Sequence, residues 1–115
     1  ETTGEELTPL AHGSSRRVFA EQTAEKLQEL LAGVVAEGTG RQAAPSEGTA
    51  AGKTGTAQTG QFRDGEELKN YWFAGFYPAE KPRWTIVVMQ DAQTEPEVSS
   101  AAIFARLCDA LSAGE

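Results

Sequence analysis

The sequence predicts an α+β fold, in which an antiparallel sheet of about three strands carries an N-terminal and a C-terminal helix packed on it. Three strand-like segments follow one another in the middle of the chain, and their connections are short enough to favour antiparallel pairing. An amphipathic helical pattern precedes them and another follows. The chain has 115 residues, 39% hydrophobic and 23% charged, which suits one small globular domain with a single core.

The first helix is expected from residue 21 to about residue 37. Its apolar positions fall on one stripe, opposite charged and amide side chains. The stripe consists of Ala24, Leu27, Leu30, Leu31, Val34 and Val35. Gly38 and Gly40 are expected to end this helix in a left-handed conformation. Residues 1–17 are polar and turn-rich, which predicts a loop that includes His12, and a short strand over residues 16–19 is left open.

The three strands are expected at residues 50–59, 71–77 and 84–90. Between the first and second strands, residues 60–70 are expected to form a longer loop with Gly60, Gly65 and five charged side chains. Residues 78–83 are expected to form a hairpin loop, and residues 91–97 an acidic loop. Ser99 or Ser100 caps the closing helix. Its apolar face consists of Ile103, Phe104, Leu107, Cys108 and Leu111. The domain therefore divides into a lead-in (1–17), a helix–sheet–helix core (18–111) and a tail (112–115).

Composition excludes several classes of function. The net charge is −7 and the ten basic residues are scattered, so no basic surface is expected to follow a nucleic-acid backbone. Cys108 and His12 are each the only residue of their kind, which predicts no disulfide, no metal site and no cofactor held by such ligands. Cys108 is expected to be a core thiol and not a nucleophile. No apolar stretch is long enough to cross a bilayer.

Residues 52–58 read Gly-Lys-Thr-Gly-Thr-Ala-Gln and are the main functional motif. In an extended backbone Lys53 and Gly55 face one way, while Thr54 and Thr56 face the other. A cation, hydroxyl donors and an unobstructed main chain together suit an anionic ligand. A phosphate-binding loop is disfavoured, because its first glycine would fall on Glu47 and because the residues after Thr54 are poor helix formers.

Three blocks in this order, residues 34–43, 52–58 and 73–78, resemble the C-terminal part of a penicillin-binding protein transpeptidase domain of the high-molecular-weight class. The resemblance implies the C-terminal portion of the β-lactamase/transpeptidase-like fold. It also implies a parent enzyme that crosslinks peptidoglycan stem peptides ending in D-Ala-D-Ala through a serine acyl-enzyme and binds β-lactams. Such a parent would act on the outer face of the bacterial cell membrane, anchored by a segment upstream of this chain.

The family carries three motifs, Ser-x-x-Lys, Ser-x-Asn and Lys-Thr-Gly, and only the third is present. No serine has a lysine three positions on, and the sole asparagine, Asn70, has Leu68 two positions before it. The chain alone is therefore expected to be inactive and to require the remaining half of the domain. A D,D-carboxypeptidase of the same family and a non-catalytic binding module remain as alternatives.

The resemblance also assigns roles to individual residues. Lys53 sets a positive field in the cleft and bonds groups of the second motif. Thr54 and Thr56 flank the docking position of the substrate carboxylate, with Thr56 as the direct contact and its backbone N–H as one half of the oxyanion hole. Gly55 keeps the strand clear of side-chain bulk, and Gln58 is a weaker candidate for substrate contact.

Two further expectations concern packing. Trp72, Phe73 and Phe76 follow on the next strand and are expected in the core and not as ligand-stacking groups. Strand 84–90 would lose its neighbour if strands from the rest of the domain are absent. An apolar edge of this kind tends to pair with another chain, so self-association of the isolated chain is expected.

Overall fold

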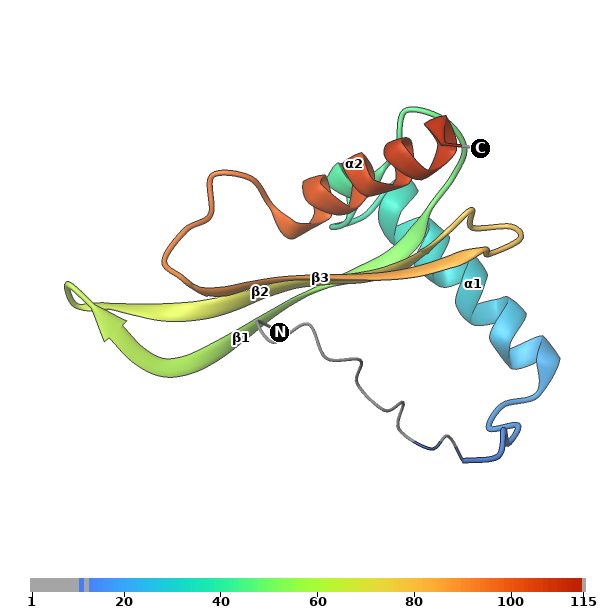
Figure 1. Ribbon diagram of the computed structural model, residues 1–115, viewed down its shortest axis with the longest axis horizontal. Coiled ribbons are helices and arrows are strands. Elements are labelled where there is room, and N and C mark those ends of the chain that lie inside the picture. The colour runs from blue at the N-terminus through green and yellow to red at the C-terminus, as the bar shows by residue number, and fades with distance from the viewer. Residues whose placement is uncertain (1–10, 12, 115) are drawn as a thin grey trace, which may run out of the picture.

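The computed structural model of the chain describes residue 11 and residues 13–114 (Figure 1). Helix α1 (Glu21–Ala36) and a short 3₁₀ helix, η1 (Arg41–Ala43), precede strands β1 (Ala51–Arg63), β2 (Glu66–Tyr77) and β3 (Trp84–Gln93), and helix α2 (Ser100–Ala113) closes the fold. The strands form one antiparallel sheet in the order β1-β2-β3. The α+β prediction is therefore confirmed. The short strand left open at residues 16–19 does not form, and His12 lies outside the described residues.

Strands β1 and β2 form one long hairpin, so the expectation of a loop over residues 60–70 is wrong. The two strands are joined by Asp64 and Gly65, whose φ angles of 52° and 85° are both positive, as a type I′ turn requires. The pairing register shifts between Gln58 and Phe62, and Gly60 lies there with φ 73°. Gly60 therefore marks a β-bulge within a continuing strand and not the end of the strand.

Strand β3 also runs past its expected end and includes the first three residues of the predicted acidic loop. A second register shift, between Lys69 and Tyr71 on β2, lies opposite this extension. Ala92 there has φ 48°, an unfavourable value for a residue with a Cβ. Its N–H donates to Asn70 Oδ1 at 2.8 Å, so the asparagine side chain supports the irregular ladder.

Helix α2 covers one face of the sheet (Figure 1). Ser99 is its N-cap and accepts a hydrogen bond from the Ala102 N–H at 3.1 Å, which decides between the two predicted caps. The rings of Phe73 on β2 and Phe104 on α2 are both fully buried, with centroids 4.6 Å apart. Cys108 is fully buried beside them in the core cluster, as predicted. Leu107, expected on the same apolar face, is 42% exposed.

Helix α1 packs mainly through its C-terminal end, where Val35 is buried, and its N-terminal half runs away from the sheet (Figure 1). Leu27 and Leu30 of the predicted stripe are exposed as a result. The left-handed helix stop is wrong, because neither Gly38 nor Gly40 has a positive φ. Glycine at 38 relieves a tight contact instead. A Cβ there would lie 3.0 Å from the Val34 carbonyl oxygen, which accepts the Gly38 N–H.

Candidate functional site

The motif predicted to be functional lies on β1, an outer strand of the described sheet that pairs with β2 on one side only. Ala51 and Gly52 at the start of β1 are buried, and exposure begins at Lys53. Gly55, Thr56 and Gln58 are exposed and Thr54 is half-buried. The structure thus brings all five predicted site residues together along one open strand edge. An open edge of this kind leaves alternate main-chain N–H and C=O groups free to bond a ligand.

Lys53 and Thr54 contact each other across the edge of the strand. Lys53 Nζ donates to the Thr54 carbonyl oxygen at 3.2 Å and to Thr54 Oγ1 at 3.3 Å. Successive residues of a strand point to opposite faces of the sheet. Because β1 has no neighbouring strand along its outer edge in the described sheet, the long lysine side chain can reach around that edge to Thr54. Within the described part of the chain no carboxylate pairs with Lys53. Its positive charge therefore stays available to an anion.

The glycines of β1 fall into two kinds. Gly52 lies opposite Gly75 in the β1–β2 register. A Cβ on Gly52 would lie 2.6 Å from the Ala74 carbonyl oxygen, and one on Gly75 would lie 2.4 Å from the Ala51 carbonyl oxygen. A Cβ on Gly55, in contrast, would meet only the Cβ of Trp72, at 3.6 Å, which is an ordinary contact. Packing within the described chain therefore requires glycine at 52 and 75 but not at 55.

Trp72 lies opposite Gly55 in the register and is 38% exposed, so the expectation that its ring belongs to the core is wrong. Phe73 is fully buried, as expected, and Phe76 is half-buried. Successive strand residues point to opposite faces, so Trp72 and Phe73 cannot both contact α2. The alternation can be read from the sequence and indicates that one of these two rings faces away from α2. In the structure this ring is Trp72, and Gly55 and Lys53 lie on the same face.

Other chemistry finds little support in the described residues. They contain no group of three or more His, Cys, Asp or Glu side chains that could hold a metal ion. Burial, with a smaller contribution from Asp109, raises the pKa of the Cys108 thiol to about 11, so this cysteine is a poor nucleophile at neutral pH. Lys53 and Thr54 lie inside a strand and do not open a helix, which agrees with the rejection of a phosphate-binding loop. Neither described α-helix is long and apolar enough to cross a membrane.

Comparison with known proteins places this fold and motif in a family. Residues 10–109 match the sequence model described as the penicillin binding protein transpeptidase domain. The chain belongs to this family.

Two curated relatives are each 40% identical to the chain. Stage V sporulation protein D of Bacillus subtilis (strain 168) gives an alignment of 81 positions, which covers 68% of this chain and 12% of that protein. Penicillin-binding protein PbpB of Mycolicibacterium smegmatis (strain ATCC 700084 / mc(2)155) gives an alignment of 90 positions, which covers 66% of this chain and 13% of that protein. The chain therefore spans only a small part of each relative's length.

Solved structures agree with this assignment. The transpeptidase domain of Burkholderia pseudomallei penicillin-binding protein 3 superposes with a TM-score of 0.73 at 29% identity, over 89% of this chain and 33% of that one. The D,D-transpeptidase domain of a peptidoglycan glycosyltransferase from Eggerthella lenta gives a TM-score of 0.69 at 30% identity, over 98% of this chain and 25% of that one. The three-stranded sheet with its two helices thus corresponds to a quarter to a third of these chains.

Proposed function

We propose that the chain forms one wall of the active-site cleft of a peptidoglycan D,D-transpeptidase. The observation that carries the proposal is the open edge of β1. Lys53 on this edge has no carboxylate partner in the described chain, and packing within the described chain does not require glycine at position 55. A positive charge beside an unobstructed strand suits the terminal carboxylate of a D-Ala-D-Ala stem peptide, or the carboxylate of a β-lactam.

In this proposal the reacting serine comes from the remaining part of the domain. Its oxygen attacks the carbonyl carbon of the penultimate D-Ala, the terminal D-Ala leaves, and the amine of a second stem peptide then releases the acyl group as a crosslink. Lys53 supplies positive potential, and the Thr56 hydroxyl binds the substrate carboxylate, with Thr54 beside it. The Thr56 backbone N–H donates one hydrogen bond to the developing oxyanion. Gln58 contacts the substrate further along the same edge.

The proposed parent works on the outer face of the bacterial cell membrane, held by an anchor upstream of this chain. It binds peptidoglycan stem peptides and β-lactams, and it requires the remaining half of the transpeptidase domain. Transfer of the acyl group to water in place of an amine would make it a D,D-carboxypeptidase. Product analysis of the complete enzyme with an added amine acceptor separates the two reactions.

The test of the carboxylate role is Thr56→Val in the complete transpeptidase that carries this chain. Valine keeps the backbone donor and removes the hydroxyl, and a hydrogen bond to a charged group contributes about 1.5–3 kcal/mol. Acylation by a carboxylate-bearing fluorescent penicillin should slow by about 10- to 100-fold. Thr94→Val, at an exposed position after β3, is the matched control and should leave the rate unchanged. An unchanged rate in Thr56→Val would show that this threonine does not bind the carboxylate.

The isolated chain supplies the complementary test. Because it lacks the serine and its lysine partner, incubation with the same penicillin should give no covalent adduct by intact-mass spectrometry. A stoichiometric adduct would overturn the assignment of the nucleophile to another part of the domain.

A further inference from the structure

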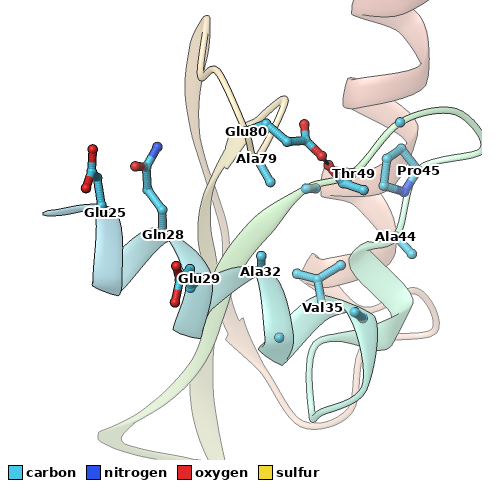
Figure 2. Close-up of a pocket in the computed structure, with 14 residues that line it drawn as sticks. Glu25, Gln28, Glu29, Ala32, Val35, Ala44, Pro45, Thr49, Ala79 and Glu80 are labelled. Carbon is cyan, nitrogen blue, oxygen red and sulfur yellow. Dashed lines mark hydrogen bonds between the residues drawn. The ribbon is translucent and has the colours of Figure 1, made fainter. Parts of the chain in front are cut away.

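A second concave site lies away from the motif, between α1 and the connections at the end of the sheet (Figure 2). It has a volume of about 560 Å³, within the range of natural ligand sites. Small apolar residues supply much of its lining, from α1, from the segment before β1 and from the β2–β3 connection. They include Ala32, Val35, Ala44, Ala50 and Ala79.

Val35 is the one residue of the apolar stripe of α1 that lines the groove, and the exposed leucines of that stripe lie elsewhere on the helix. At 3.6 residues per turn, Glu25, Gln28, Glu29 and Ala32 lie on one side of α1, whereas exposed Leu27 and Leu30 lie on the other. Figure 2 shows Glu25 and Gln28 projecting from the helix on one side, and Glu80, beside Thr49, on the other. Leu27 and Leu30 therefore do not contribute to the groove.

The groove has a long wall on α1. Its lining positions on α1 extend from Glu25 to Ala36, eleven helical steps, or about 16 Å at 1.5 Å per residue. That length equals about five residues of extended peptide at roughly 3.3 Å each. This wall is therefore long enough for a short extended peptide segment.

The charge of the rim is negative. Glu25, Glu29 and Glu80 line the groove, and no lysine or arginine is among its lining residues. A hydrogen bond from the Thr49 hydroxyl lowers the pKa of Glu80, so this carboxylate is ionised at neutral pH. Lys26 lies 3.4 Å from Glu29 and offsets part of that charge, but both side chains are exposed, and such a pair is weak. The rim thus complements a cationic ligand.

We propose that this groove binds a short extended peptide of a partner protein, with apolar side chains against Ala32, Val35 and Ala79 and flanking Lys or Arg residues facing the carboxylates of the rim. The apolar floor supplies most of the affinity, because exposed ion pairs contribute little. The carboxylates decide which sequences bind, since an acidic peptide would be repelled. The inference is independent of the transpeptidase proposal, because none of its residues belongs to the β1 motif.

The test uses the synthetic peptide acetyl-Lys-Leu-Ala-Leu-Lys-amide, titrated into the ¹⁵N-labelled chain. Saturable amide shifts are expected at Ala32, Ala50 and Ala79, and not along residues 53–58. The peptide acetyl-Glu-Leu-Ala-Leu-Glu-amide should bind at least about tenfold more weakly because its charges are repelled. Hexylamine, which carries a cation and an alkyl chain but no peptide, should give no saturable shifts at the same concentrations.

Variants separate the floor from the rim. Ala32→Trp fills the groove and should abolish binding, and the double variant Glu25→Lys/Glu29→Lys should weaken it by about tenfold. Glu37→Lys is the control, since it reverses an exposed charge just beyond α1 and outside the groove. It should leave the Kd within about twofold. Circular dichroism verifies the fold of every variant.

Four outcomes would overturn the proposal: no binding, shifts elsewhere on the surface, equal affinity for the acidic peptide, or full affinity in a folded Ala32→Trp variant. Saturable binding of hexylamine in place of the peptide would assign the groove to small cations instead. Peptide-independent dimerisation that produces the same shifts would assign the groove to a second copy of the chain.

Discussion

The two kinds of glycine on the β1–β2 pair give a quantitative prediction. In Gly52→Ala the new methyl carbon would lie 2.6 Å from both the Ala74 carbonyl oxygen and a ring carbon of Phe73. In Gly75→Ala it would lie 2.4 Å from the Ala51 carbonyl oxygen. Because one obstacle in each case is backbone and Phe73 is fully buried, neither clash can relax by a simple side-chain rotation.

Overpacking of this type costs about 1–3 kcal/mol, sometimes more. Replacing glycine by alanine also restricts the unfolded chain, which offsets about 0.4–1 kcal/mol. The free energy of unfolding should therefore fall by about 1–2 kcal/mol or more in Gly52→Ala and in Gly75→Ala. In Gly55→Ala the only close contact is 3.6 Å, so the loss of unfolded-state entropy dominates. The free energy of unfolding should stay within about 1 kcal/mol of the parent chain, with a shift toward greater stability.

Urea unfolding followed by circular dichroism measures all three variants, with the midpoint as the readout and an unchanged m-value as the condition for comparing them. A Gly55→Ala variant destabilised as much as Gly52→Ala would refute the distinction, because internal packing would then require both glycines. In the complete transpeptidase, Gly55→Ala should retain stability while slowing acylation by penicillin. If Gly55→Ala lowered both the stability and the acylation rate, Gly55 would be required for the fold and not specifically for the proposed cleft.

Two further predictions concern the isolated chain. The pKa of the Cys108 thiol is raised from 9.0 to about 11 in the folded state, so its contribution to stability is fully present below pH 9 and is lost as the pH rises through 11. Urea midpoints should fall over that window in the parent chain and less in Cys108→Ala, which is the control; equal pH profiles would refute burial of the neutral thiol. The isolated chain should also self-associate through the open edge of β3 or the exposed leucines of α1. Light scattering that shows a strict monomer at high concentration, together with full amide protection along β3, would show that the chain protects this edge by itself.

Periodicity predicted the order and type of most elements of the fold. The bounds of α1 follow from its apolar spacing, and the single-face pattern of α2 correctly placed Phe104 and Cys108 in the core. The β1–β2 hairpin was missed because glycines and charges were taken as loop formers. The Asp64-Gly65 pair in fact provides the positive φ angles of a tight turn. The end of β3 was missed because the Asn70 side chain supports a bulge across the sheet, which local sequence does not reveal.

The candidate site shows the same limit. The strand-like pattern of the sequence placed residues 53–58 on a strand. The exposure of Trp72, in contrast, depends on which face of the sheet α2 covers. That choice is made by tertiary packing. The groove beside α1 is formed by residues of α1, of the segment before β1 and of the β2–β3 connection, so its presence depends on tertiary packing that no local pattern indicated. Leu27 and Leu30 were assigned to a buried stripe because periodicity predicts which residues share a face, but not whether a partner covers that face.

The position of the motif relative to the core explains how a single strand can serve both the fold and the proposed cleft. The first two residues of β1 are buried, and the Gly52–Gly75 pair lets the strand backbones and the rings of Phe73 and Phe104 approach closely. That close packing fixes the position of the strand immediately before Lys53. A site on a regular element anchored in this way holds its geometry more accurately than one on a loop. Substitution at Gly52 should therefore disturb ligand binding indirectly, by moving β1, even though its own side-chain position faces the core.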